Sequence, residues 1–353
     1  MKTRWKHRPE GSNWGEFGPD DQLGAMNLVG SDQVLKGLAE ARTGRTFSLS
    51  LPLDHPGGNV LHPSRHPPRR FATLRAGKSA GEQCFCFALG RDNPLFTDVV
   101  SDDVVLLHTQ YSTQWDGLAH IGSLFDSDGS GKAEITFYNG YRPRHGLKVA
   151  ERCERTEAWM AYENPRADVL GIENLARHGV QGRAVMIDLF RHFGRENRAV
   201  GHDELQRILK QDGVAIEKGD MVCLYTGLDD VILGMRGKPD PETLHRSCAG
   251  LDGSDKRLLS WITDTGIAAL ISDNFAVELM PPTVASAPQT SHAMLPLHEH
   301  CLFKNGIHLG ELWFLRDLAA WLRDHKRSCF LLTAPPLHLP GAVGSPVTPI
   351  ATV

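Results

Sequence analysis

Residues 183–190 read RAVMIDLF, an almost continuous run of apolar side chains. A strand of this kind, without regular polar alternation, belongs to a sheet that helices cover on at least one face. Similar apolar runs and amphipathic segments alternate along the second half of the chain: strands at 221–226, 267–272 and 329–333, and helices at 202–211, 254–261 and 312–322. Strands that alternate with helices predict a mixed α and β fold.

The first half of the chain is richer in predicted strands. Short β-prone runs occupy 83–89, 104–108 and 134–138, and turn sequences separate them. One of these, DSDGSG at 126–131, resembles a calcium loop, but Phe137 stands where an EF-hand needs a glutamate, so we predict a hairpin turn. A helix is predicted after Ser31, its expected N-cap, and ends before Gly44. The expected class is α+β, a strand-rich core flanked by helices.

Composition excludes several classes of protein. The chain has 353 residues, of which 41% are hydrophobic and 23% charged, and its formal net charge is −4. This composition predicts a globular protein with no broad electrostatic footprint for nucleic acid or a membrane surface. No apolar segment follows the basic N-terminus, so we expect a cytoplasmic protein. The seven cysteines are scattered without a CxxC pair and are expected to be reduced.

The stretch at 53–70, LDHPGGNVLHPSRHPPRR, is rich in Pro, Gly, His and Arg. Such a composition predicts a stiff, exposed loop. The loop is either a plain connector or a lid over a site.

Two stretches carry candidate catalytic side chains. In HTQYSTQWDGLAH at 108–120, Asp116 and His120 follow an apolar run, where a carboxylate and an imidazole can share a metal or perform acid/base chemistry. In LHEHCLFKNGIHLGE at 297–311, three histidines and two acids lie close together, but HEH is not the HExxH of zinc proteases. Either stretch can also be a solvated turn or helix face. Nucleotide-binding glycine loops and the GxSxG elbow are absent from the sequence.

The segment 110–120, QYSTQWDGLAH, resembles the motif H-x-G-T-H-x-D-x-P-x-H of the cyclase-like metal-dependent hydrolases, which include bacterial kynurenine formamidase and isatin hydrolase. The overlay needs no gap. Further stretches resemble landmarks of the family's longer members in the same order: SNWGEFGPDDQLGAMNLV, HGVQGRAVMIDL, KGDMVCLYTG, LISDNFAVE, GIHLGE and PGAVGSPVTPIA. The resemblance covers most of the chain.

The resemblance implies a swivelling β/β/α fold, a homodimer or homotetramer, and hydrolysis of a C–N or C–O acyl bond with a divalent metal. It implies a single domain over 1–353, with an N-terminal arm, helix and loop at 1–70 and a catalytic core at 71–353. Residue by residue, Asp116 matches the family's metal-binding aspartate, His120 its proton-transfer histidine, and Glu311 its late glutamate. The late histidine falls on His300, which we prefer on spacing, or on His298.

Gln110 and Gln114 depart from the motif, because the family has metal-binding histidines at both positions. An amide oxygen is a harder and weaker ligand than imidazole, so the site is expected to prefer Mn²⁺ or Mg²⁺ over Zn²⁺. A metal-free site is the other alternative, in which the two amides act as fixed dipoles on a carbonyl group.

The leading expectation is therefore an enzyme that acts on a small cyclic amide, lactone or related molecule, with no nucleic-acid or membrane partner. Trp115 and Phe71 are candidates for an aromatic pocket wall, as is Trp14. Arg70, with its neighbour Arg69, is a candidate for binding a substrate carboxylate. The alternatives are a metal-independent lactonase or cyclase and a catalytically silent small-molecule-binding protein of the same fold.

Overall fold

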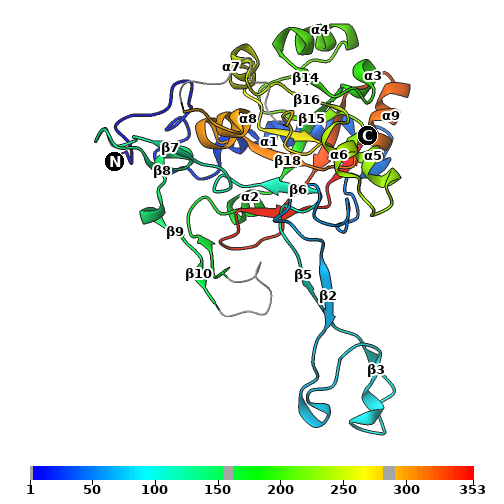
Figure 1. Cartoon of the computed structure of the whole chain (residues 1–353). Coiled ribbons are helices and arrows are strands. Elements are labelled where there is room, and N and C mark those ends of the chain that lie inside the picture. Colours follow the sequence, from blue (N-terminus) through cyan, green and yellow to red (C-terminus); the bar gives the residue numbers. More distant parts are fainter. Residues whose placement is uncertain (1–2, 154–161, 281–290) are drawn as a thin grey trace.

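The computed structural model describes residues 3–153, 162–280 and 291–353. Its centre is a nine-stranded sheet with the strand order β1-β21-β19-β13-β15-β17-β18-β6-β20 (Figure 1). The strands are β1 (Thr46–Ser48), β6 (Gln114–Asp116), β13 (Gln181–Asp188), β15 (Met221–Tyr225), β17 (Ala269–Ser272), β18 (His308–Glu311), β19 (Cys329–Thr333), β20 (Gly344–Pro346) and β21 (Ile350–Thr352). The four central strands from β13 to β18 run parallel, and antiparallel strands extend the sheet on both sides.

Helices cover both faces of this sheet. They are α1 (Ser31–Glu40), α2 (Glu173–His178), α3 (Phe190–Phe193), α4 (His202–Asp212), α5 (Leu228–Gly234), α6 (Pro241–His245), α7 (Lys256–Thr265), α8 (Pro296–His298) and α9 (Arg316–Asp324). Successive residues of β15 point to opposite faces. Val222 and Leu224 pack in one core with α4 and α7, whereas Cys223 packs in a second core with α9. Burial on both faces explains the continuous apolar strands, and the predicted mixed class is confirmed.

Three helix starts differ from the prediction. Ser31 is the first residue of α1 rather than its cap, and its side chain forms no capping bond. At α7 the cap is Asp255, whose carboxylate accepts two backbone N–H groups, and not Ser254. The helix predicted at 312–322 begins only at Arg316, where the buried Asp229 carboxylate accepts the N–H groups of the first turn. A long-range carboxylate therefore sets this start, which no local pattern could indicate.

A long arm projects from the body of the molecule (Figure 1). It is built from β2 (Arg69–Ala72) paired with β5 (Asp103–Leu106), and β3 (Phe87–Ala88) paired with β4 (Val99–Val100). The strand predicted at 83–89 shrinks to β3, because the arm leaves the sheet and offers it only a two-residue partner. A second hairpin, β7 (Ser123–Phe125) with β8 (Glu134–Thr136), confirms the turn predicted at DSDGSG.

Three further two-stranded ladders complete the structure: β9 (Leu147–Lys148) with β12 (Arg166–Ala167), β10 (Glu151–Arg152) with β11 (Tyr162–Glu163), and β14 (Arg198–Val200) with β16 (Ala249–Leu251). Six of the seven cysteines, Cys84, Cys86, Cys223, Cys248, Cys301 and Cys329, are free thiols. Among the described residues, no helix combines the length and the apolar character needed to cross a membrane.

Candidate active site

The motif at 110–120 contains a strand of the main sheet and does not merely follow one. Gln114, Trp115 and Asp116 form β6, which lies between β18 and β20. The register places Glu311 opposite Gln114. Since side chains alternate along a strand, Gln114, Asp116 and Glu311 share one face of the sheet, and all three are buried.

Trp115 points to the other face. Its ring packs against Trp313 with centroids 5.1 Å apart, and its Nε1 donates to the carbonyl of Ala334 at 2.8 Å. The predicted role of Trp115 in a substrate pocket is therefore wrong, because the strand period turns its ring into the core. Trp14 is likewise buried and donates to the carbonyl of Phe303.

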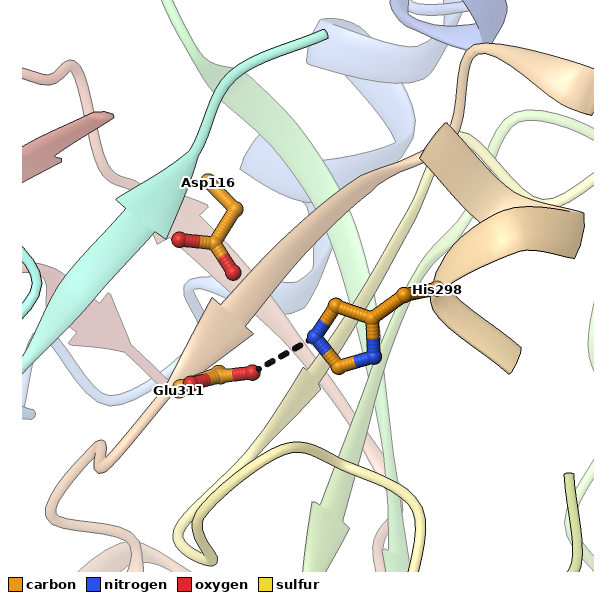
Figure 2. Close-up of side chains that lie close together, drawn as sticks. All are labelled: Asp116, His298 and Glu311. Carbon is orange, nitrogen blue, oxygen red and sulfur yellow. Dashed lines mark hydrogen bonds and ion pairs between the residues drawn. The ribbon is translucent and has the colours of Figure 1, made fainter. Parts of the chain in front are cut away.

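A cluster of three side chains forms the centre of the site (Figure 2). Asp116 from β6, Glu311 from β18 and His298 at the end of α8 each offer a ligand atom, and these atoms lie within 4.8 Å of one another. His298 Nε2 is 3.1 Å from the Glu311 carboxylate. Strand β18 and helix α8, both distant in sequence from the motif, thus meet at strand β6, which carries it.

His300, the preferred histidine from the sequence, lies outside this cluster. Its Nε2 is 2.9 Å from the Thr263 hydroxyl, and burial lowers its pKa to about 4. His300 lies in the π-helical turn Glu299–Lys304 that continues α8, and two residues along a helix correspond to roughly half a turn, so His298 and His300 point in nearly opposite directions. The alternative, His298, therefore takes the place expected for His300.

Glu278 is a member of the site that the sequence reasoning missed. Its carboxylate accepts the backbone N–H groups of Leu297 and His298, both at 3.1 Å, and lies 2.8 Å from His298 Nδ1. A hydrogen bond at Nδ1 directs Nε2 of the ring toward Glu311. The only signal was the last letter of ISDNFAVE, an acid after an apolar strand, and nothing local relates it to a histidine 20 residues away.

Gln114 holds the two carboxylates together through its amide N–H group. Its Nε2 donates to Asp116 Oδ1 at 3.0 Å and to Glu311 Oε2 at 3.2 Å. Gln114 Oε1 and Asp116 Oδ2 are buried without a hydrogen-bond partner among the described residues. The Gln114 amide hydrogens thus lie between the Asp116 and Glu311 carboxylates. Gln114 Oε1 and Asp116 Oδ2 remain as acceptors that could bind a cation.

Gln110 makes no hydrogen bond to these groups. Its Oε1 accepts from the Thr109 hydroxyl at 2.8 Å. Its Nε2 lies so close to Gly344 that a Cβ added to this glycine would be 2.5 Å from the nitrogen. Since Gly344 pairs with Asp116 across the sheet, Gln110 lies beside the site without joining the cluster.

His120 lies at the edge of the cluster. Its Nε2 is 3.8 Å from Asp116 Oδ1, and its side chain is 18% exposed whereas that of Asp116 is 1% exposed. His120 is therefore the group that reaches both the buried carboxylate and the solvent-accessible side, as proton transfer requires.

Burial and neighbouring charges shift the ionisation of the cluster. Burial raises the pKa of Asp116, against the opposing effect of His120. Burial would also raise the pKa of Glu311, but the hydrogen bond from His298 holds that pKa below its usual value. Burial would lower the pKa of His298, yet Glu278 and Glu311 raise it to about 10. Without a metal, an imidazolium therefore stands between two carboxylates.

The described donor set also fits a divalent metal. It comprises two carboxylates, one imidazole and the buried, unpartnered amide oxygen of Gln114. Oxygen-rich sets of this kind suit Mn²⁺ or Mg²⁺ better than a site rich in imidazole does. A metal would require neutral His298, because an imidazolium has no free lone pair.

The other predicted substrate contacts lie elsewhere. Phe71 and Arg70 belong to β2 on the projecting arm, and Phe71 is 45% exposed. Strand β2 lies on the arm, which projects away from the sheet that carries the cluster (Figure 1).

Comparison with known proteins agrees with this architecture. Residues 47–279 match the family described as "putative cyclase". The chain belongs to this family. A crystal structure of a novel cyclase is 28% identical, with 97% of each chain covered and a TM-score of 0.71. No curated protein sequence matches the chain.

Two isatin hydrolases share the fold. Isatin hydrolase A from Ralstonia solanacearum is 14% identical, with 87% of this chain and 91% of that chain covered and a TM-score of 0.50. Isatin hydrolase A from Labrenzia aggregata, bound to benzyl benzoate, is 16% identical, with 91% and 98% covered and a TM-score of 0.50. The resemblance inferred from the sequence is confirmed, and membership of the putative cyclase family supports an enzyme.

Proposed function

We propose that this family member hydrolyses or cyclises a C–N or C–O acyl bond in a small cyclic amide, lactone or related substrate. The observation that carries the proposal is His120, partly exposed and 3.8 Å from the buried Asp116 carboxylate. An imidazole beside a carboxylate, at the rim of a buried polar cluster, is arranged for general acid/base chemistry.

In this proposal His120 takes a proton from the attacking group and returns it to the leaving group. Asp116 stabilises the imidazolium that forms, since it lies close to His120 Nε2. Gln114 fixes Asp116 and Glu311 through its two amide hydrogens. Glu278 orients His298 and thereby the Nε2 that faces Glu311.

A divalent metal in this site would be held by Asp116, His298 and Glu311, with Gln114 Oε1 as a further oxygen ligand. When bound, it would supply Lewis-acid polarisation of a carbonyl group and lower the pKa of water. The amide of Gln114 would then have to present its oxygen instead of its N–H group.

A metal-independent lactonase or cyclase, or a silent binding protein, is the second candidate. The observation that favours it is the Gln114 amide, whose N–H groups donate to both Asp116 and Glu311 and so bridge the two carboxylates without a metal. The cluster then keeps its arrangement without a metal ion.

Elemental analysis of the purified protein, combined with assays on lactones, lactams and formamides with and without chelator, tests these proposals. We expect little tightly bound zinc and turnover of at least one substrate class. Turnover that survives chelation selects the metal-independent enzyme. Absence of turnover on the whole panel, with or without added Mn²⁺, contradicts the enzyme.

We further propose a homodimer or homotetramer that works as one domain in the cytoplasm on a small molecule. The projecting arm supports assembly, because it carries exposed apolar side chains such as Phe71 and Leu95, which is 87% exposed. Light scattering of the full chain tests the assembly, and a monomer at micromolar concentration contradicts it.

A further inference from the structure

The loop at 53–70 lies next to the candidate site. A small cleft there is lined by His62 and Arg65 from this loop, by Gln110 and Tyr111 from the motif segment, and by Phe275. The Tyr111 hydroxyl accepts the N–H of Gly57 at 3.1 Å and donates to the carbonyl of Gly58 at 2.8 Å. The motif segment therefore anchors the loop, which is more than a connector.

Arg65 is the cation of this cleft. Its Nη1 donates to the Gln110 carbonyl at 2.9 Å, which is the one hydrogen bond of its side chain to the described part of the chain. An arginine has five N–H donors, so most of this guanidinium remains available. The contact with Gln110, whose amide lies against Gly344 opposite Asp116, places this charge beside the cluster, where it lowers the pKa of both Asp116 and Glu311.

His62 lines the same cleft as Arg65. Burial lowers the pKa of His62, and the charges of Arg65 and His120 lower it further, which favours a neutral imidazole that can donate one hydrogen bond. The cleft thus brings Arg65 and His62 together, and Gln110 joins it to the cluster, because the Gln110 amide lies against Gly344, the partner of Asp116 across the sheet.

We propose that Arg65, supported by His62, binds a carboxylate group of the molecule on which the enzyme acts. The inference rests on the proposed function and specifies the group that Arg65 contacts: a carboxylate that the substrate already carries near the scissile bond, or the carboxylate that hydrolysis of a lactone, lactam or amide creates there. The planar fork of arginine matches a carboxylate in a bidentate manner. Because Asp116, Glu278 and Glu311 would repel an anion, such a substrate needs a fixed cation at this entrance.

The loop structure favours such a role. Pro63, Pro67 and Pro68 restrict the backbone around Arg65, and Tyr111 holds the preceding glycines in place. A guanidinium positioned in advance loses less freedom on binding than one on a mobile chain. Arg70, five residues later on β2, has the same charge but lies on the arm and provides the matched control.

The binding test uses benzoate as the anionic probe and benzamide as its neutral counterpart, with titration calorimetry on the full-length protein. We expect Arg65→Met to weaken benzoate binding at least about tenfold, while Arg70→Met leaves it unchanged and benzamide responds to neither. Equal benzoate affinity of wild type and Arg65→Met overturns the proposal, as does failure of the wild type to bind benzoate.

A second measurement avoids dependence on how the Arg65 variant folds. In the wild type, the ring-proton NMR signals of His62, assigned by their loss in His62→Gln, should shift with benzoate and not with benzamide. An unchanged His62 signal in the presence of bound benzoate places the anion elsewhere and contradicts the proposal.

Kinetics distinguish the origin of the carboxylate. If the substrate already carries the carboxylate, Arg65→Met raises KM for an acid-bearing lactone but not for its methyl ester. If hydrolysis creates the carboxylate, Arg65→Met weakens product inhibition and leaves KM unchanged. Benzoate binding through Arg65 without turnover of any acyl substrate would contradict the proposed enzyme while the anion site stands.

Discussion

Glu278→Gln tests whether the buried carboxylate behind His298 stabilises both the fold and the site. The native carboxylate accepts three N–H groups, two from the backbone of Leu297 and His298 and one from His298 Nδ1. The glutamine keeps one accepting oxygen. Its amide N–H group replaces the second carboxylate oxygen and faces an N–H donor, with which it cannot form a hydrogen bond. It also removes the negative charge that assists all three bonds.

The structure sets the size of the effect. One buried donor without a partner costs about 1 to 3 kcal/mol, and the lost charge assistance adds roughly 1 kcal/mol. We therefore expect the free energy of unfolding to fall by about 2 to 4 kcal/mol. Because the His298 ring loses the acceptor that orients it, Mn²⁺ affinity should fall about 10-fold to 100-fold if the site holds a metal.

Urea unfolding followed by tryptophan fluorescence measures the first effect, and titration calorimetry with Mn²⁺ measures the second. Glu299→Gln is the matched control, since Glu299 follows His298 directly but is partly exposed, accepts a hydrogen bond from the Ser123 hydroxyl and forms a 3.7 Å ion pair with Lys304. A loss of less than about 0.5 kcal/mol in Glu278→Gln, equal to that of the control, would refute the reasoning.

Three further predictions concern single side chains. His120→Ala should abolish turnover while the circular dichroism spectrum stays that of the wild type, and unchanged turnover would remove His120 from the proposed chemistry. Gln114→His should raise zinc affinity in calorimetry, because it replaces an amide with an imidazole between two carboxylates; an unchanged affinity would show that Gln114 only packs. His300 has a pKa lowered to about 4 by burial, so the folded state takes up its proton later than the unfolded state as pH falls. The free energy of unfolding should therefore decrease between pH 6.5 and 4, by about 3 kcal/mol for this group. His300→Gln should reduce that decrease in urea titrations, and an identical pH profile would contradict the assignment.

The sequence predicted the family, the mixed fold class and the candidate carboxylates Asp116 and Glu311. These rest on patterns that a chain displays locally. Apolar runs at 183–190 and 221–226 became β13 and β15, because strands that helices cover on both faces need apolar side chains throughout. The motif at 110–120 carried the family assignment through the spacing of its polar residues.

Local spacing could not choose between His298 and His300. The choice depended on the direction of α8 relative to β18, which places His298 against Glu311 and His300 against Thr263. Glu278 was missed for a related reason, since its partner His298 lies 20 residues away in the sequence.

The sequence alone determined which groups this protein contains: the apolar strands, the family motif and the two glutamines in place of histidines. Only the tertiary structure decided which of these groups meet. Strand register brought Gln114 against Glu311, and the contacts between the loop at 53–70 and the motif segment brought Arg65 to the Gln110 carbonyl, while Arg70 lies on β2 of the arm. The physical reason is that side-chain types follow local patterning, whereas hydrogen bonds and charge interactions depend on distances that only the packed chain establishes.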